Sequence, residues 1–192
     1  MVTTAVMVVL GGARSGKSAA AEHLAASTGT SVTYVATGPI PDDTVDADWA
    51  TRVAAHRARR PGSWATVELG GGDLAATLAA VPGTALVDSL GTWVAGLLDV
   101  GVDPAAPGRP GAPLADLLVV LDERRRDGRP TVIVSEEVGL GVHPSSALGG
   151  RFRDVLGEVN RAVGDAADTV LLVVAGRVLE LAERVPGAGG DR

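Results

Sequence analysis

Short apolar runs alternate along the chain with segments of helical periodicity. Buried strands are predicted for the apolar runs at residues 5–10, 31–36, 84–87, 131–134, 169–174 and 178–181. Helices are predicted for residues 18–26, 47–59, 73–80, 90–98, 113–126 and 147–166. This alternation predicts a three-layer α/β fold with a mainly parallel sheet. The last two runs are joined at residues 175–177 and predict an antiparallel hairpin at the edge of that sheet.

The length of the chain, 192 residues, is that of a single domain, which we expect over residues 1–185, with a disordered tail at 186–192. Proline and glycine crowd residues 101–113 and predict a surface loop between two helices. Aliphatic residues dominate the apolar positions, and aromatic residues make up only 3% of the chain. Such a composition suits a parallel sheet that helices cover on both faces.

The net charge of −6 at pH 7 argues against a general nucleic-acid or membrane-surface binder, because both of those partners are anionic. The chain has no cysteine, which excludes a disulfide framework, a thiolate zinc site and a cysteine nucleophile. The first apolar run is six residues long and has no basic leader, so we expect no signal peptide and no membrane insertion. We therefore expect a cytoplasmic protein.

A complete phosphate loop, G-x-x-x-x-G-K-[ST], lies between the first predicted strand and the first predicted helix. In such a loop, backbone N–H groups and the helix N-terminus hold phosphate oxygens, the lysine reaches the terminal phosphates, and the last hydroxyl can ligate Mg²⁺. Lys17 is the only lysine of the chain. The predicted nucleotide-binding residues of this loop are Gly11, Gly12, Ala13, Arg14, Ser15, Gly16, Lys17 and Ser18.

Asp88 stands at the end of a predicted buried strand, where nucleotide-binding proteins place a second acid. We expect it to hold Mg²⁺ together with Ser18, although an N-cap for the following helix is an alternative role. Asp88 and Gly91 also satisfy the D-x-x-G pattern of regulatory GTPases. Those proteins read guanine with N-K-x-D, which needs a second lysine that this chain lacks.

His56 lies among four arginines, at positions 52, 57, 59 and 60. A neutral imidazole can attack the α-phosphorus of a nucleoside triphosphate while guanidinium groups neutralise charge on the phosphates. The alternative is a solvated basic helix end, since charge runs usually face water. The local pattern leaves both hypotheses open.

Residues 134–144 follow a predicted strand and bring Glu136, Glu137 and two glycines to the carboxyl edge of the sheet, where ligands bind in open α/β folds. Either glutamate is a candidate general base or metal ligand, and a polar surface loop is the alternative. His143 has no assigned role.

Seven segments, in this order, resemble one known family. They are G-G-A-R-S-G-K-S from residue 11, Y-V-A-T from 34, R-V-x-x-H-R-x-R-R-P from 52, W-x-T-V-E from 64, L-V-D-S-L from 86, V-S-E-E-V-G-L-G-V-H-P from 134 and F-R-D-V-L-G-E-V-N from 152. The chain is similar in these segments to the bifunctional adenosylcobinamide kinase / adenosylcobinamide-phosphate guanylyltransferases of cobalamin biosynthesis. The resemblance covers residues 8–181, nearly the whole chain.

The resemblance implies a P-loop NTPase of RecA-like fold, assembled as a homotrimer and using Mg²⁺. It implies phosphorylation of adenosylcobinamide with ATP or GTP, and then transfer of GMP from GTP to adenosylcobinamide phosphate through a guanylyl-histidine at His56. Lys17 would act in both steps. Beyond the phosphate loop, the residues implied to contact GTP are Ala36, Thr37, Gly38, Arg57, Ala58, Arg59, Arg60, Glu68 and Asp88.

This chain departs from the family pattern at two positions. The family often has asparagine where Glu136 stands and an aliphatic residue where His143 stands.

Two other functions are compatible with the phosphate loop alone: a monofunctional small-molecule kinase in which the arginines form only a lid, and a nucleotide-dependent regulatory switch that modifies no substrate.

Overall fold

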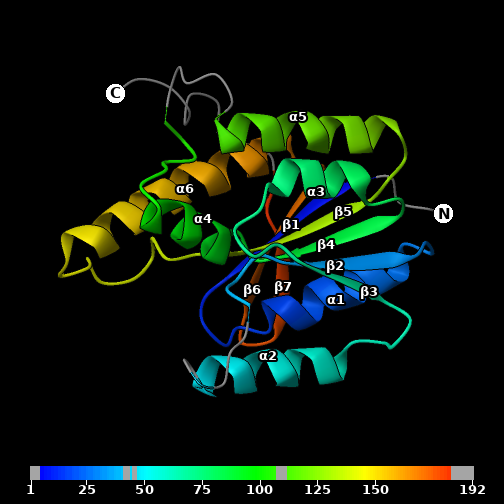
Figure 1. Ribbon diagram of the computed structural model, residues 1–192, viewed down its shortest axis with the longest axis horizontal. Coiled ribbons are helices and arrows are strands. Elements are labelled where there is room, and N and C mark those ends of the chain that lie inside the picture. Colours follow the sequence, from blue (N-terminus) through cyan, green and yellow to red (C-terminus); the bar gives the residue numbers. More distant parts are fainter. Residues whose placement is uncertain (1–4, 41–43, 45–46, 107–111, 183–192) are drawn as a thin grey trace.

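The computed structural model describes residues 5–40, 44, 47–106 and 112–182. In this part of the chain seven strands form one sheet, in the order β3-β2-β4-β5-β1-β6-β7 (Figure 1). All neighbouring strands are parallel except β6 and β7, which form an antiparallel hairpin at one edge. The predicted sheet and edge hairpin are confirmed. The strands are β1 (Val6–Gly11), β2 (Val32–Ala36), β3 (Ala65–Glu68), β4 (Thr84–Asp88), β5 (Thr131–Glu136), β6 (Thr169–Val174) and β7 (Arg177–Glu180).

Helices cover both faces of the sheet and complete the three layers (Figure 1). In the view of Figure 1, α3, α4, α5 and α6 lie above the sheet, while α1 and α2 lie below it. Their positions in the sequence agree with the predicted helices to within one residue at every end. The helices are α1 (Lys17–Ser27), α2 (Ala47–Arg59), α3 (Leu74–Ala80), α4 (Leu90–Asp99), α5 (Pro113–Arg126) and α6 (Ala147–Ala166).

Strand β1 separates two hydrophobic cores. Val6 and Val8 belong to the core under α3–α6, while Met7 and Val9 belong to the core under α1. Successive side chains of a strand point to opposite faces, so a strand with both faces buried must be apolar at every position. This is why β1 reads as an uninterrupted apolar run that ends at the phosphate loop.

The structure contains one strand that the sequence did not predict, and two predicted segments fall outside the described residues. Strand β3 was not predicted, because its four residues form an outer strand and are largely exposed, and so carry no buried apolar pattern. The proposed tail at 186–192 and the centre of the predicted loop, residues 107–111, lie outside the described residues. A single domain over residues 1–185 stays a prediction. No helix among the described residues is long and apolar enough to cross a membrane.

Arg124 is the largest fully buried side chain in the described structure, although it is followed by two further arginines in α5. Burial lowers the pKa of its guanidinium to about 10, so the group stays charged at neutral pH. Its nitrogens donate to the backbone carbonyls of Leu78, Val81, Gly83 and Pro130, at 2.7–3.1 Å. One buried side chain thus connects the end of α3, the start of β4 and the start of β5.

Replacing Arg124 with leucine is expected to lower the free energy of unfolding by about 3–5 kcal/mol, because four carbonyls lose the hydrogen bonds that the buried guanidinium donates. Urea denaturation followed by circular dichroism measures this difference. Arg126→Leu is the matched control, since that side chain is 70% exposed, and we expect a change within about 0.5 kcal/mol. Equal losses in the two variants would contradict the structural role of Arg124.

Candidate active site

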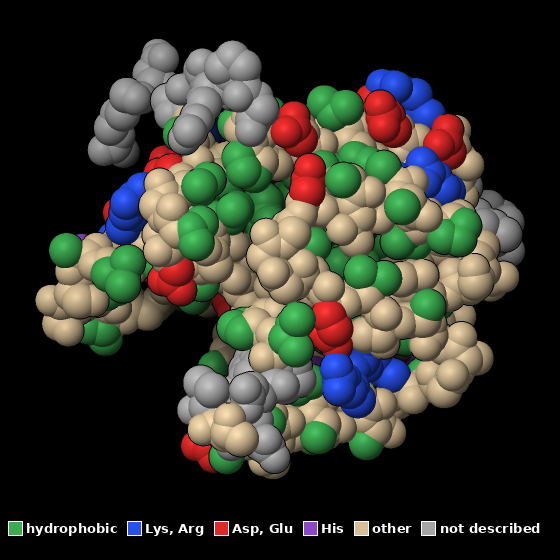
Figure 2. Space-filling model, viewed as in Figure 1, with side chains coloured by type: hydrophobic (Ala, Val, Ile, Leu, Met, Phe, Trp, Pro, Cys, Tyr) green, Lys and Arg blue, Asp and Glu red, His purple; other side chains and the backbone are tan. Residues whose placement is uncertain are grey.

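The carboxyl ends of β1, β2, β4 and β5 surround a cavity of about 400 Å³. Figure 2 shows that the molecule is hollowed on one side, between the start of α6 and α2. The residues that line the cavity are Ala13, Arg14, Lys17, Ser18, Tyr34, Ala36, Gly38, Pro39, Val53, His56, Arg60, Glu68, Asp88, Ser89, Thr92 and Glu136. Most of the predicted site regions therefore contribute at least one residue to one cavity.

The phosphate loop has the predicted strand-loop-helix geometry, with β1 ending at Gly11 and α1 beginning at Lys17. A Cβ atom at Gly11 would lie 2.5 Å from the Ser15 hydroxyl oxygen, and Gly16 has a φ of 98°. Both positions therefore require glycine. Lys17 donates from Nζ to the backbone carbonyl of Gly12, at 3.3 Å, so its ammonium group folds back over the loop.

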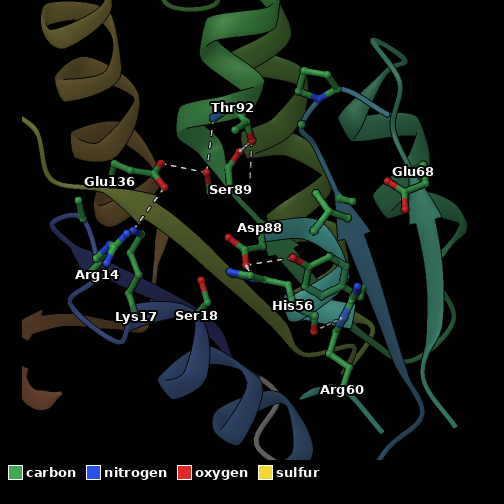
Figure 3. A pocket seen from close by; sticks show the side chains of 16 residues that line it. Arg14, Lys17, Ser18, His56, Arg60, Glu68, Asp88, Ser89, Thr92 and Glu136 are labelled. Carbon is green, nitrogen blue, oxygen red and sulfur yellow. Dashed lines mark hydrogen bonds and ion pairs between the residues drawn. The ribbon is translucent and has the colours of Figure 1, made fainter. Parts of the chain in front are cut away.

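Asp88 lies at the centre of the cavity, as the last residue of β4 (Figure 3). Its carboxylate accepts a hydrogen bond of 3.0 Å from the Tyr34 hydroxyl, and its Oδ2 atom lies 4.0 Å from Nδ1 of His56. Asp88 does not cap the helix that follows. Ser89 is the N-cap of α4, and its side chain accepts from the backbone N–H of Thr92. The carboxylate of Asp88 therefore faces the cavity instead of capping α4.

In the sequence, Tyr34 is marked only as the first residue of the Y-V-A-T segment shared with the family. Burial and the neighbouring Asp88 carboxylate raise the pKa of its hydroxyl above the usual range, so the group remains a hydrogen-bond donor. The Arg60 guanidinium lies 3.6 Å from the centre of the Tyr34 ring and donates from Nε to the His56 carbonyl at 3.3 Å. These contacts fix the C-terminal end of α2 against β2.

Arg57, Arg59 and Arg60, which follow His56, separate into two groups. Arg60 lines the cavity, whereas Arg57 is paired with Glu68, and Arg59 is paired with Glu22 at 3.2 Å. Arg59 also lies within 3.5 Å of Nδ1 of His56. Ala58 is exposed on the same helix. The end of α2 therefore places His56 and one guanidinium inside the cavity and keeps two more beside it.

Among the residues expected after β2, Ala36 and Gly38 line the cavity. The hydroxyl of Thr37 donates to the Ser89 carbonyl at 2.6 Å and lies 2.7 Å from the Thr92 hydroxyl. Thr37 is buried and ties β2 to the start of α4. Its side chain is thus occupied within the protein.

Glu136 and Glu137 have different surroundings. From the sequence, either could be a general base, a metal ligand or part of a polar surface loop. Glu136 is the last residue of β5 and lines the cavity, with Oε1 3.5 Å from Nζ of Lys17. Glu137 accepts instead from the backbone N–H of Gly139, at 2.8 Å, within its own loop. His143 is exposed, and its Nδ1 atom lies 2.9 Å from the Pro144 carbonyl oxygen.

The donor set of the cavity fits a hard cation. The Ser18 hydroxyl and the Asp88 carboxylate offer oxygen ligands, which Mg²⁺ prefers. The described residues hold no group of three His, Cys, Asp or Glu side chains that would bind a metal by themselves. Mg²⁺ bound through few protein ligands and the phosphates of a nucleotide is the usual arrangement at phosphate loops.

A glycine-rich loop between β1 and α1, with an acid at the end of a nearby parallel strand, defines a P-loop nucleotide-binding protein. The sequence model of the family described as cobinamide kinase / cobinamide phosphate guanyltransferase matches residues 7–181. The chain belongs to this family, so the resemblance stated above is confirmed.

Curated relatives match almost end to end. The chain is 38% identical to the bifunctional adenosylcobalamin biosynthesis protein CobP of Pseudomonas aeruginosa, over 91% of this chain and 95% of that protein. It is 35% identical to the bifunctional adenosylcobalamin biosynthesis protein CobU of Escherichia coli, over 89% and 96%. Among solved structures, an ATPase of a bacterial type III secretion system shares the fold, with a TM-score of 0.53 and 12% identity over 88% of this chain and 51% of that chain.

Proposed function

We propose that this protein carries out both reactions for which its family is described: phosphorylation of adenosylcobinamide by ATP or GTP, and transfer of GMP from GTP to the product. One observation carries the proposal. The same cavity contains the phosphate-loop lysine, Lys17, and a histidine, His56, beside a carboxylate. A kinase needs the first of these groups, and a nucleotidyltransferase with a covalent intermediate needs both.

The charges in the cavity support one orientation for the nucleotide. Arg14 and Lys17 lie at one side, Asp88 and His56 at the centre, and Glu68 at the opposite side (Figure 3). A triphosphate whose terminal phosphates lie on the loop and Lys17 extends its α-phosphate toward His56. Its base then extends toward Glu68, which is consistent with the GTP contacts implied by the family resemblance.

In the phosphorylation step, the loop amides, the N-terminus of α1 and Lys17 hold the terminal phosphates of the nucleotide. Ser18 and Asp88 are the residues that would hold Mg²⁺, and the bound ion would neutralise charge that develops on the transferred phosphoryl group. Lys17 is only 12% exposed, which keeps water away from its interaction with the phosphates.

In the guanylyl step, Nδ1 of His56 faces the Asp88 carboxylate, which favours a proton on Nδ1 and leaves Nε2 as the nucleophile. The Nε2 lone pair attacks the α-phosphorus, a P–N bond forms, and the bond to pyrophosphate breaks. Lys17 and Arg60 offset the charge of the leaving group. A phosphate oxygen of adenosylcobinamide phosphate then attacks the same phosphorus and releases the free imidazole, giving adenosylcobinamide-GDP.

Labelling tests this proposal. Protein mixed with α-labelled GTP and Mg²⁺ is expected to acquire label that is labile in acid and stable in alkali, as a phosphoramidate is. A monofunctional kinase would transfer only label from the γ-phosphate to adenosylcobinamide. A regulatory switch would hydrolyse nucleotide slowly and leave adenosylcobinamide unmodified. Wild-type protein that never acquires α-label would overturn the guanylyltransferase assignment. The homotrimer and the cytoplasmic location stay predictions.

A further inference from the structure

The carboxylate of Glu136 occupies a place in the cavity that neither reaction has yet used. It is the last residue of β5, the strand between β1, which leads into the phosphate loop, and β4, which ends at Asp88. Glu136 pairs in register with Gly11, the first residue of the loop. Strand order therefore places this side chain beside the loop, where the terminal phosphate of a nucleotide binds.

The backbone of Glu136 is firmly held. Its carbonyl accepts from Nδ2 of Asn160 on α6, at 3.0 Å, and the Oδ1 atom of the same asparagine lies 2.6 Å from the Ser135 hydroxyl. The N–H of Glu137 donates to the Gly11 carbonyl at 3.2 Å. A side chain anchored in this way keeps a fixed position relative to the phosphate loop.

The two carboxylate oxygens of Glu136 have different partners (Figure 3). Oε2 accepts from the Ser89 hydroxyl at 2.9 Å and from the Gly91 N–H at 3.1 Å. Oε1 is 3.5 Å from Nζ of Lys17. A Cβ atom at position 91 would lie 2.0 Å from Oε2, so glycine there lets α4 approach the carboxylate. One oxygen is thus anchored, and the other faces the group that binds the terminal phosphate.

The other carboxylates of the cavity are engaged elsewhere. Asp88 accepts from Tyr34 and faces His56, and Glu68 is paired with Arg57. Glu136 is therefore the lining carboxylate in contact with Lys17. The side chain is 30% exposed, so a substrate hydroxyl entering the cavity can reach it.

We propose that Glu136 is the proton acceptor for the substrate hydroxyl in the phosphorylation step, an assignment that rests on the proposed function. The hydroxyl O–H bond breaks and its proton moves to Oε1. The hydroxyl oxygen forms a bond to the γ-phosphorus, while the bond from that phosphorus to the β-phosphate oxygen breaks and the nucleoside diphosphate leaves. When the nucleotide binds, the Lys17 ammonium group leaves the Glu136 carboxylate and pairs with the phosphates.

The guanylyl step has no use for this base. The nucleophile there is an imidazole lone pair, and the acceptor is a phosphate oxygen that carries no proton at neutral pH. The two reactions of one cavity therefore depend on different carboxylates, with Glu136 serving phosphoryl transfer and Asp88 lying beside the histidine. This difference makes the assignment testable within a single protein.

Glu136→Gln keeps the size of the side chain and an oxygen acceptor for Ser89 and Gly91, but removes the base. We expect kcat for phosphorylation to fall about 10²–10³-fold, with KM for nucleotide changed little. Labelling by α-labelled GTP, and GMP transfer to supplied adenosylcobinamide phosphate, are expected to stay within about threefold of wild type. The kcat for phosphorylation is expected to be higher in Glu136→Asp, which keeps a carboxylate, than in Glu136→Gln. Glu137→Gln, the matched control, is expected to phosphorylate like wild type.

Three results would overturn the proposal. If Glu136 only holds Lys17 in place, Glu136→Gln will weaken nucleotide binding in calorimetry, and both reactions will fall together. If Glu136→Asn, the residue often found here in the family, keeps phosphorylation within about threefold, no base is needed at this position. If Glu137→Gln alone loses phosphorylation, the base is the neighbouring residue. Wild-type protein that lacks phosphorylation altogether would instead contradict the proposed function.

Discussion

His56→Ala is expected to abolish labelling of the protein by α-labelled GTP and to lower GMP transfer at least about 10³-fold, because no second imidazole lines the cavity among the described residues. Phosphorylation of adenosylcobinamide is expected to stay within about tenfold of wild type. His56 faces Asp88 at the centre of the cavity, whereas the γ-phosphate of the proposed nucleotide would lie on the loop beside Lys17. The split between the two activities is the result that distinguishes a nucleophile from a structural histidine.

The control for this variant is His23→Ala. His23 is exposed on α1 and does not line the cavity, so the variant is expected to label and to phosphorylate like wild type. Both variants should be compared with wild type by thermal unfolding, since the His56 carbonyl is an acceptor for Arg60 and α2 must stay in place. Equal labelling of His56→Ala and wild type would remove His56 from the mechanism, and parallel loss of both activities in a folded variant would assign it to nucleotide binding.

Lys17→Ala is expected to lower both activities about 10²–10³-fold, because both reactions begin with a triphosphate held on the loop. The structure adds a second reason. Without Lys17, the carboxylate of Glu136 loses its partner at 3.5 Å and remains as an uncompensated negative charge facing the phosphates. Nucleotide binding by calorimetry and the two activity assays measure the effect.

A double variant separates the two causes. If repulsion by Glu136 contributes to the defect of Lys17→Ala, then adding Glu136→Gln should restore part of the nucleotide affinity, and the two substitutions will not be additive. Lys17→Arg is the charge-conserving control, and we expect it to bind nucleotide more tightly than Lys17→Ala. A Lys17→Ala protein that loses only one activity would show that the two reactions hold their nucleotides in different places.

The order of the elements was predictable because each signal is local. A buried parallel strand must be apolar at every position, and Val6 and Val8 in one core with Met7 and Val9 in the other show why β1 reads as it does. The phosphate loop was equally evident, since its glycines, lysine and serine follow one another within eight residues. Strand β3 escaped notice because an exposed four-residue strand has no such pattern.

The surroundings of single polar residues were not predictable, because they depend on contacts between distant segments. Arg124 resembles its neighbours Arg125 and Arg126 in the sequence, yet it alone of the three is fully buried, against carbonyls more than 40 residues away. Ser89, not Asp88, proved to be the cap of α4. The partners of Arg124 lie on other elements, and Asp88 accepts from Tyr34 on β2, whereas the cap formed by Ser89 is local to α4.

By itself, then, the sequence determined a P-loop α/β protein, its family and the set of candidate residues, because apolar periodicity and contiguous motifs are properties of the chain. Only the tertiary structure decided which of those residues meet. The insertion of β5 between β1 and β4 brings Glu136, more than 100 residues away in sequence, to Lys17, and the fold of α2 brings His56 to Asp88. Strand order and helix placement are set by burial of both faces of the sheet, which no short segment encodes.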